Sequence, residues 1–477
     1  MSFVFFDTET TGLRQGFDQI VHFAAIRTDK DLNEIDRFEA RSRLLPHVVP
    51  HPAALQTNRL SIDRITDKRL PSHYEMTGAI RRTLLSWSPS IFVGYNSIRF
   101  DEEMLRHAFF QTLHPTFLTS SHGNGRADAL GLVMAAAAQS STCLSVPRGL
   151  EGRPVFRLDR LASANNVVHR QAHDAMADVT ATLELCRRVR DRVPELWQRF
   201  VRFSKKATVS DFVDSEDGFF FTEFFGNEAY HTPVVCLGSD PDQPNGRLCL
   251  RLDLAVENLA AMPDETLLGY LSEKPSPVRR LRINAAPMLT AFYDASDAML
   301  GGAGIDDLEA CARRIKEDAA FCSRVISTYV AAREPRLPAV NVEQQIYDRF
   351  PGPDDERRMA NFHHAGLPEA LAIVQSFDDE RLRAFGLRLI YFGGRSTLPD
   401  DIRLVVERDL TDRLVDIEAG GFTLYQALQE TDALLNRDEV DAGGILSNYR
   451  SYLINRIERV AKFRTERFAV DAGKNAI

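Results

Sequence analysis

The feature that most constrains the fold lies at the start of the chain, where four apolar residues precede two carboxylates. Residues Phe3 to Phe6 form an unbroken apolar run, which predicts a short β-strand buried on both faces. Asp7 and Glu9 follow at the end of this strand, and a period of two places them on the same side. Two adjacent carboxylates repel each other, so a divalent metal ion is the simplest partner for both. Taken alone, the same pattern is also typical of surface turns.

The length and composition are those of a globular protein with about three domains. The chain has 477 residues, of which 44% are hydrophobic and 26% are charged. No apolar run is long enough to span a bilayer, and no basic segment precedes the first strand, so we expect a cytoplasmic protein. The six cysteines show no CxxC pair and no zinc-binding spacing, so we expect them to be reduced and structural.

The net charge of −9 does not indicate a generally basic nucleic-acid binder, although a local groove can still be basic. Three stretches are rich in arginine or lysine, within residues 148–160, 187–206 and 279–282. Such runs are more often solvated faces than binding sites. The sequence contains no Walker-type phosphate loop, so an ATP-driven motor is disfavoured.

The pattern of predicted elements divides the chain into three domains. Alternating strand and helix signals over residues 1–197 predict an α/β domain. Residues 198–340 contain short strand-like runs between turn residues, which predicts a small β-rich domain. Residues 341–477 are helical in pattern and predict an all-helical C-terminal domain. The aromatic stretch 219–225 fits either sheet core or a surface on which bases stack, and the core is the more frequent case.

Two further acids and a histidine complete a set of chemistry-bearing residues in the first domain. Asp101 begins a helix predicted over residues 100–113, at the edge of the sheet where α/β sites form. His173 and Asp178 lie five residues apart at the start of the last helix of this domain, whose predicted N-cap is Asp174. We expect Asp178 one turn into the helix as a metal ligand. We expect His173 in the preceding loop, where it is free to act as a base.

This combination resembles the DnaQ-like, or DEDDh, 3′–5′ exonucleases, and among them the bacterial exodeoxyribonuclease I family. The similar segments run through nearly the whole chain, at residues 94–101, 156–158, 172–179, 277–289, 341–347 and 381–398. The resemblance implies an RNase H-like exonuclease domain followed by an SH3-like domain and an all-helical C-terminal domain. Residues 13–18 and 118–154 depart from the family pattern, so contacts made by these loops stay open.

The resemblance also implies the roles of the site residues. Four carboxylates would hold two Mg²⁺ ions, with Mn²⁺ as a substitute, and a histidine would accept the proton of the attacking water. The implied ligands are Asp7, Glu9, Asp101 and Asp178, and the implied base is His173. Glu9 would also lie against the terminal sugar. Arg157, in a helix predicted over residues 155–165, and Arg106 are candidate substrate contacts, although Arg157 is as readily a surface arginine.

The activity implied by the resemblance is processive degradation of single-stranded DNA from its 3′ end to nucleoside 5′-monophosphates, in DNA repair and recombination. The enzyme would be a cytoplasmic, nucleoid-associated monomer that binds the acidic, hydrophobic C-terminal tail of the single-stranded DNA-binding protein. Two alternatives stay open. One is an exoribonuclease acting on RNA 3′ ends, because no motif reveals contacts to the 2′-OH. The other is a non-catalytic single-strand-binding adaptor, which the presence of all five catalytic positions disfavours.

Overall fold

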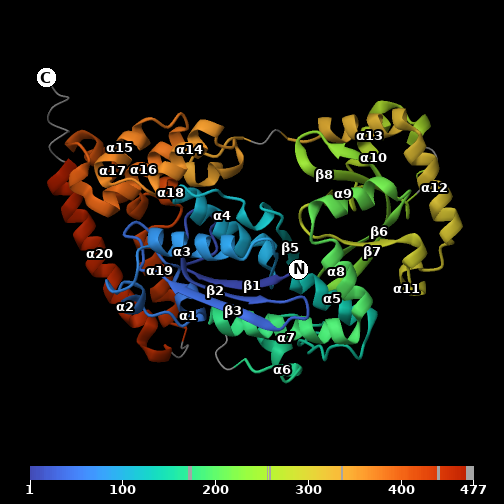
Figure 1. Cartoon of the computed structure of the whole chain (residues 1–477), viewed down its shortest axis with the longest axis horizontal. Coiled ribbons are helices and arrows are strands. Elements are labelled where there is room, and N and C mark those ends of the chain that lie inside the picture. The colour runs from blue at the N-terminus through green and yellow to red at the C-terminus, as the bar shows by residue number, and fades with distance from the viewer. Residues whose placement is uncertain (170–173, 255, 257–258, 335–336, 438–440, 469–477) are drawn as a thin grey trace.

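Strand β1 lies at the centre of a five-stranded mixed sheet (Figure 1). The computed structural model describes residues 1–169, 174–254, 256, 259–334, 337–437 and 441–468. The strand order is β3-β2-β1-β4-β5, with β1 antiparallel to β2 and parallel to β4. The strands are β1 (Phe3–Thr10), β2 (Ile20–Thr28), β3 (Glu34–Arg41), β4 (Ile91–Gly94) and β5 (Gly125–Asp128). A central strand is covered on both faces, which explains the unbroken apolar run.

Different helices cover the two faces of this sheet (Figure 1). Phe3 and Phe5 contribute to one apolar core with residues of α5 and α7, whereas Val4 and Phe6 contribute to another with residues of α3 and α4. The helices and turns of this part are α1 (Pro52–Thr57), α2 (Ile62–Ile65), α3 (His73–Ser86), η1 (Ser97–Arg99), α4 (Asp101–Gln111), η2 (Leu118–Ser120), α5 (Ala129–Gln139), α6 (Leu158–Ala164), α7 (Ala175–Arg192), α8 (Pro194–Arg202) and α9 (Lys206–Ser215). The alternation of side chains along β1 therefore serves two cores at once.

A second sheet follows, in which neighbouring strands are antiparallel in the order β10-β6-β7-β8-β9. Its strands are β6 (Phe219–Phe225), β7 (Glu228–Asp240), β8 (Gln243–Arg251), β9 (Val278–Arg282) and β10 (Met288–Ala291). The accompanying helices and turns are η3 (Leu259–Ala261), α10 (Asp264–Leu271), η4 (Phe292–Asp294), α11 (Asp297–Leu300), α12 (Ile305–Glu317) and α13 (Ala319–Ala331). Phe219 and Phe220 are buried in its cores, whereas Phe225 is 51% exposed. Most of the aromatic stretch is therefore core.

The remaining described residues are helical and pack back onto the first part of the chain (Figure 1). Their elements are η5 (Val342–Tyr347), α14 (Pro353–Phe362), α15 (Leu367–Gln375), α16 (Glu380–Gly394), η6 (Arg395–Thr397), α17 (Asp400–Val415), α18 (Ile417–Gly420), α19 (Leu424–Leu435), η7 (Ala442–Gly444) and α20 (Ile445–Phe468). Tyr449 of α20 is fully buried and its hydroxyl donates to the Pro50 carbonyl at 2.6 Å. No helix among the described residues is long and apolar enough to cross a membrane.

The predicted fold class is confirmed: an α/β part is followed by a β-rich part and a helical part. The domain boundaries after residues 197 and 340 stay predictions. The six cysteines are free thiols, as expected.

Three local predictions are wrong. Asp7 and Glu9 lie within β1 rather than after it, because pairing with β2 continues to Thr10 and overrides the low strand propensity of acidic residues. The helix predicted over residues 155–165 begins only at Leu158. In the C-terminal part the sequence predicts helices over residues 342–350, 355–363, 380–391, 399–419 and 449–462, but the first of these is the 3₁₀ turn η5, and α15 and α19 were not among them.

Candidate metal and active site

Strand β1 and helix α7 bring three of the predicted carboxylates together. Oxygen atoms from Asp7, Glu9 and Asp178 all lie within 4.8 Å of one another. Asp7 and Glu9 share one side of β1 because successive strand residues alternate. Asp178 lies in the first turn of α7, which packs against β1. One divalent cation can therefore contact an oxygen atom of each residue.

Asp101 is the fourth predicted carboxylate, and it lies beside this group rather than in it. It is the first residue of α4 and is buried. Its Oδ1 accepts hydrogen bonds from the Thr8 backbone N–H at 3.1 Å and from the Thr8 hydroxyl at 2.5 Å. Thr8 stands between Asp7 and Glu9 in β1, so this contact ties the start of α4 to the strand that carries the other acids.

His169 contacts the same site from the segment before α7. Its Nε2 lies 2.5 Å from Asp178 Oδ1, and its side chain is buried. The hydrogen bond to Asp178 raises the pKa of His169. Asp174 stands at the N-cap position of α7 as predicted, but its side chain does not cap the helix. Asp174 Oδ2 instead accepts a hydrogen bond from Arg41 Nη2 at 3.2 Å.

Burial and mutual repulsion raise the pKa values of the site acids. The pKa of Asp7 lies well above its usual value because the group is buried and faces other acids, Asp101 and Asp178 foremost. Burial, and then the charges of Asp178 and Asp101, raise the pKa of Glu9 to about 9. Burial also raises the pKa of Asp101 to about 7, against the hydrogen bonds from Thr8. Without a cation, Glu9 therefore holds a proton at neutral pH.

The donor set fits a hard divalent cation. Carboxylate oxygens are the ligands that Mg²⁺ and Mn²⁺ prefer in proteins. Among the described residues, no Lys or Arg side chain forms an ion pair with Asp7, Glu9 or Asp178. A bound cation supplies the missing positive charge and favours the ionised form of each ligand.

The other predicted site residues lie in different settings. His173 lies outside the described residues. Arg157 immediately precedes α6 and is exposed, and its guanidinium forms two 3.2 Å hydrogen bonds with Asp159. Arg106 is buried in α4 and donates from Nη1 to Glu103 at 2.9 Å and to the Tyr347 hydroxyl at 3.0 Å. Arg106 therefore connects α4 to η5, and the substrate roles of both arginines stay predictions.

Comparison with known proteins relates this chain to nucleases. Residues 4–186 match the RNase T family model, which is described as Exonuclease. Over 402 residues the chain is 27% identical to exodeoxyribonuclease I of Escherichia coli strain K12, and the match covers 80% of this chain and 83% of that protein. Residues 4–186 therefore form an exonuclease domain, and over 80% of its length the chain is homologous to curated exodeoxyribonuclease I proteins. Exonucleases of this kind generally use divalent metal ions.

Solved structures extend the match to the fold of the whole exodeoxyribonuclease. E. coli exonuclease I in complex with a dA16 oligonucleotide has a TM-score of 0.81 and 23% identity, and the match covers 96% of this chain and 99% of that chain. An SSB/exonuclease I structure in complex with the inhibitor CFAM has a TM-score of 0.79 and 22% identity, and covers 95% and 99% of the respective chains. At these identities the likeness establishes the fold.

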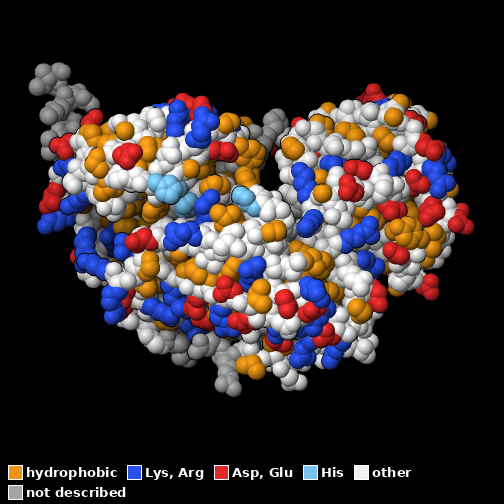
Figure 2. Space-filling model, in the orientation of Figure 1, with side chains coloured by type: hydrophobic (Ala, Val, Ile, Leu, Met, Phe, Trp, Pro, Cys, Tyr) orange, Lys and Arg blue, Asp and Glu red, His pale blue; other side chains and the backbone are white. Residues whose placement is uncertain are grey.

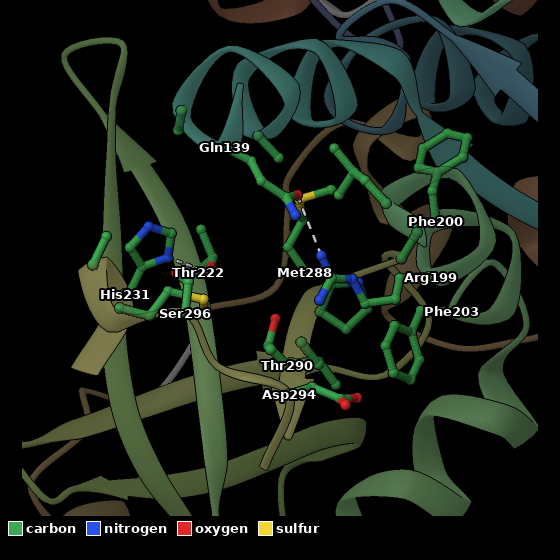
Figure 3. Close-up of a pocket in the computed structure, with 18 residues that line it drawn as sticks. Gln139, Arg199, Phe200, Phe203, Thr222, His231, Met288, Thr290, Asp294 and Ser296 are labelled. Atoms are coloured by element: carbon green, nitrogen blue, oxygen red, sulfur yellow. Dashed lines mark hydrogen bonds between the residues drawn. The ribbon is translucent and has the colours of Figure 1, made fainter. Parts of the chain in front are cut away.

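A second hollow of this exodeoxyribonuclease lies where α5 and α8 face the second sheet. It is a cavity of about 250 Å³ with a largely apolar wall that includes Phe200, Phe203 and Met288. Arg199 reaches toward Gln139, with Nη2 3.3 Å from Oε1 (Figure 3). The cavity thus combines apolar surface with one half-buried guanidinium.

Sequence reasoning missed two contributors to the site of this exodeoxyribonuclease, Thr8 and His169. Thr8 carries a hydroxyl between the two acids of β1, a position from which a side chain points to the opposite side of the strand. His169 precedes His173 by four residues. That spacing is the only signal that was available, and it does not say which histidine faces the acids.

Proposed function

We propose that this protein is a metal-dependent 3′–5′ exonuclease that acts as a monomer and degrades single-stranded DNA processively to nucleoside 5′-monophosphates in DNA repair and recombination. The observation that carries the proposal is the group of Asp7, Glu9 and Asp178, whose oxygens lie within 4.8 Å and which no Lys or Arg among the described residues neutralises. Hydrolysis of a phosphodiester with hard cations needs such a set of oxygen ligands.

We propose Mg²⁺ as the cofactor, in two sites, with Mn²⁺ as a substitute. Asp7, Glu9 and Asp178 would hold the ions together with Asp101, which Thr8 orients at the edge of the group. When bound, the ions polarise the scissile phosphate and lower the pKa of a coordinated water. The hydrogen bond from His169 fixes the orientation of the Asp178 carboxylate, as outer-shell partners of metal ligands do.

The remaining roles belong to residues that contact the strand or move the proton. His173 would accept the proton of the attacking water, and Glu9 would lie against the terminal sugar. Arg157, which is exposed beside α6, would contact a backbone phosphate after exchanging Asp159 for it. The domains proposed over residues 198–340 and 341–477 would hold the rest of the strand, which provides processivity without ATP. The bound oligonucleotide in the E. coli structure supports a single strand as the substrate.

The decisive experiment is a time course on a 5′-labelled single-stranded DNA oligonucleotide with Mg²⁺, beside the matching RNA and a blunt DNA duplex. A ladder that shortens from the 3′ end of the single-stranded DNA, and that EDTA abolishes, is the expected result. Faster loss of the RNA would move the assignment to an exoribonuclease. Metal-dependent binding without shortening of any strand would leave a non-catalytic adaptor.

The base is tested separately with His173→Ala. This variant should bind the metal and the strand like the parent but hydrolyse roughly 10²- to 10⁴-fold more slowly, as expected for loss of a positioned base. A variant that retained full activity at neutral pH would show that another group accepts the proton.

We also propose that the cavity beside Arg199 binds the acidic, hydrophobic C-terminal tail of the single-stranded DNA-binding protein. An apolar wall suits the hydrophobic end of such a tail and the guanidinium suits its carboxylates. Arg148 and Arg279 are less suited, because Arg148 donates to the Gly152 carbonyl and Arg279 pairs with Glu223. The existence of an SSB/exonuclease I structure supports the partnership. Arg199→Ala should weaken binding of a labelled tail peptide, whereas Arg148→Ala should not.

A further inference from the structure

Two arginines from distant parts of the chain, Arg99 and Arg282, lie near enough for their charges to repel, and among the described residues neither forms an ion pair with a carboxylate. Arg99 is exposed at the end of η1, and Arg282 is exposed at the end of β9. Within the described residues, neither guanidinium forms an ion pair or a side-chain hydrogen bond, although most arginines of this chain do. Partial burial, and then the positive charges of Arg99 and Arg280, lower the pKa of Arg282.

The fold itself holds these two arginines together. Arg126 of β5 is buried, with Nη1 3.1 Å from Glu102 Oε2 in α4. Its other terminal nitrogen donates to the carbonyl of Asn284, two residues after Arg282. Arg126 therefore connects the segment after β9 to α4, the helix that begins two residues after Arg99. A contact through a buried, ion-paired arginine is rigid, so the closeness of the two exposed guanidiniums does not depend on flexible side chains alone.

The surrounding acids do not neutralise this pair. Glu103 is the acid that attracts Arg282, but its carboxylate already accepts hydrogen bonds from Arg106 and from the Tyr347 hydroxyl. Arg280, which adds to the positive charge, lies 3.8 Å from Asp240 on its other side. An arginine stays charged at all physiological pH values, so a bound anion would relieve the repulsion.

The position of the pair indicates which anion. Arg99 lies two residues before Asp101, at the edge of the candidate active site, and Arg282 lies on the β-rich part. Figure 2 shows that Lys and Arg side chains border the hollow between the helical part and the β-rich part. The phosphates of a nucleic-acid strand whose 3′ end reaches the carboxylates are anions that guanidinium forks match well.

We propose that Arg99 and Arg282 together bind one backbone phosphate of the DNA strand as it enters the active site, and so set how far the 3′ end reaches. The inference rests on the proposed function, because it takes the strand as the substrate. Both arginines position the substrate and neither touches the reacting atoms. The pair also couples the β-rich part to the nuclease site, since one phosphate contacts both.

The first test measures binding of single-stranded DNA in EDTA at several salt concentrations, for Arg99→Gln, Arg282→Gln and the double variant. Removing one phosphate contact should reduce the slope of log affinity against log salt by about 0.7 and weaken binding several-fold at low salt. Because the arginines share one phosphate, the double variant should lose this slope in full, whereas each single variant keeps one guanidinium on the phosphate and should lose less. The matched control is Arg313→Gln. Arg313 lies on α12 and forms a surface ion pair with Asp217, which this variant loses.

The second test locates the phosphate with oligonucleotides that carry one neutral methylphosphonate, moved stepwise from the 3′ end. At one position the substitution should weaken binding to the parent protein but not to the double variant. Arg99→Lys with Arg282→Lys should retain part of the salt dependence. The proposal would be overturned if the methylphosphonate weakened binding equally in the parent and the double variant at every position, or if the salt slopes were unchanged. It would also be overturned if the double variant bound only an acidic tail peptide more weakly and bound the DNA strand like the parent.

These binding measurements also separate the inference from the function on which it rests. A protein that binds the strand through this phosphate but never shortens it would refute the exonuclease and leave the arginine pair in place. Conversely, if the double variant hydrolysed the strand from the 3′ end with the KM, salt slope and methylphosphonate pattern of the parent, only the proposed phosphate site would be refuted.

Discussion

Two groups of buried carboxylates in this protein differ in what neutralises them. In the helical part, Glu343 is 2% exposed and contacts both Arg388 and Arg413, with Arg413 Nη1 2.8 Å from Oε1. Burial opposes ionisation there, yet the two arginines lower the pKa of Glu343. In β1, Asp7 and Glu9 have no such partner among the described residues and their pKa values are raised.

This difference in neutralisation distinguishes acids that stabilise the fold from acids that are suited to bind a ligand. Glu343 joins η5 to α16 and α17, and its positive partners are encoded in the same chain. Asp7, Glu9 and Asp178 have no Lys or Arg partner among the described residues, and the proposed cation would come from solution. An unneutralised cluster of buried acids is unfavourable for folding, so its presence indicates a function rather than a structural role.

The largest expected effect comes from removing the acids that lack an internal partner. Asp7→Ala or Asp178→Ala should abolish nucleotide release with Mg²⁺, by more than the roughly 10- to 100-fold lost with an outer-shell partner. Strand binding, measured by fluorescence anisotropy, should stay largely intact because other parts of the chain hold the strand. The surface variant Asp217→Ala serves as the control and should hydrolyse like the parent. Activity within tenfold of the parent in either site variant would show that these acids are not metal ligands.

The comparison predicts opposite effects on stability for the two kinds of acid. Glu343→Gln leaves two buried arginines without their shared charge and should destabilise the protein by about 3 to 5 kcal/mol. Glu9→Gln removes a carboxyl that is costly to bury and, in EDTA, should stabilise the protein by about 1 to 3 kcal/mol. Thermal unfolding of both variants in EDTA measures the sign of each change in the free energy of unfolding. The same sign in both would mean that the acids of β1 are neutralised within the chain after all.

The contributions of Glu9 and Glu343 to the pH dependence of stability should also be opposite in sign. The pKa of Glu9 rises from 4.5 in the unfolded chain to about 9 in the folded protein. Between these values the folded state binds more protons than the unfolded state, so in EDTA stability falls as pH rises toward about 9. Glu343, with a lowered pKa, contributes stability that is present above its unfolded value and is lost as pH falls.

Unfolding midpoints of the parent and Glu9→Gln between pH 5 and 9 (about the span of the Glu9 shift) would measure this contribution, since the variant should show a flatter profile. Added Mg²⁺ should reduce the difference, because metal ligands are ionised when bound. Parallel profiles for the two proteins in EDTA would contradict the raised pKa of Glu9.

The smallest expected effect concerns the hydrogen bond from His169 to Asp178. His169→Ala should lower activity roughly 10- to 100-fold by freeing the carboxylate to rotate. His169→Gln, which can still donate an N–H, should recover part of the loss. A shift of the Mg²⁺ titration to higher concentration would distinguish a positioning role from general loss of stability. An unchanged Mg²⁺ titration in His169→Ala would show that Asp178 is oriented by other contacts.

The sequence was sufficient wherever the answer depended on local periodicity. The helix predicted from Ala175 to about residue 192 is α7, and the helix predicted over residues 100–113 is α4, which spans Asp101–Gln111. The extension of β1 through Glu9 was not predictable, because the ladder to β2 that sustains it is a tertiary contact. The helix α19 was also missed, since its capping box begins at Thr423 within a stretch without clear periodicity.

The sequence by itself determined which residues are candidates for the chemistry and the faces on which they lie, because side-chain alternation and helical period are local properties of the chain. It established Asp7, Glu9, Asp101 and Asp178 as candidates before any contact was known. Only the tertiary structure decided that three of them converge while Thr8 binds the fourth, and that the charge of Arg99 acts on Arg282. Distances and charge balance depend on how distant segments pack together, and no local pattern contains that information.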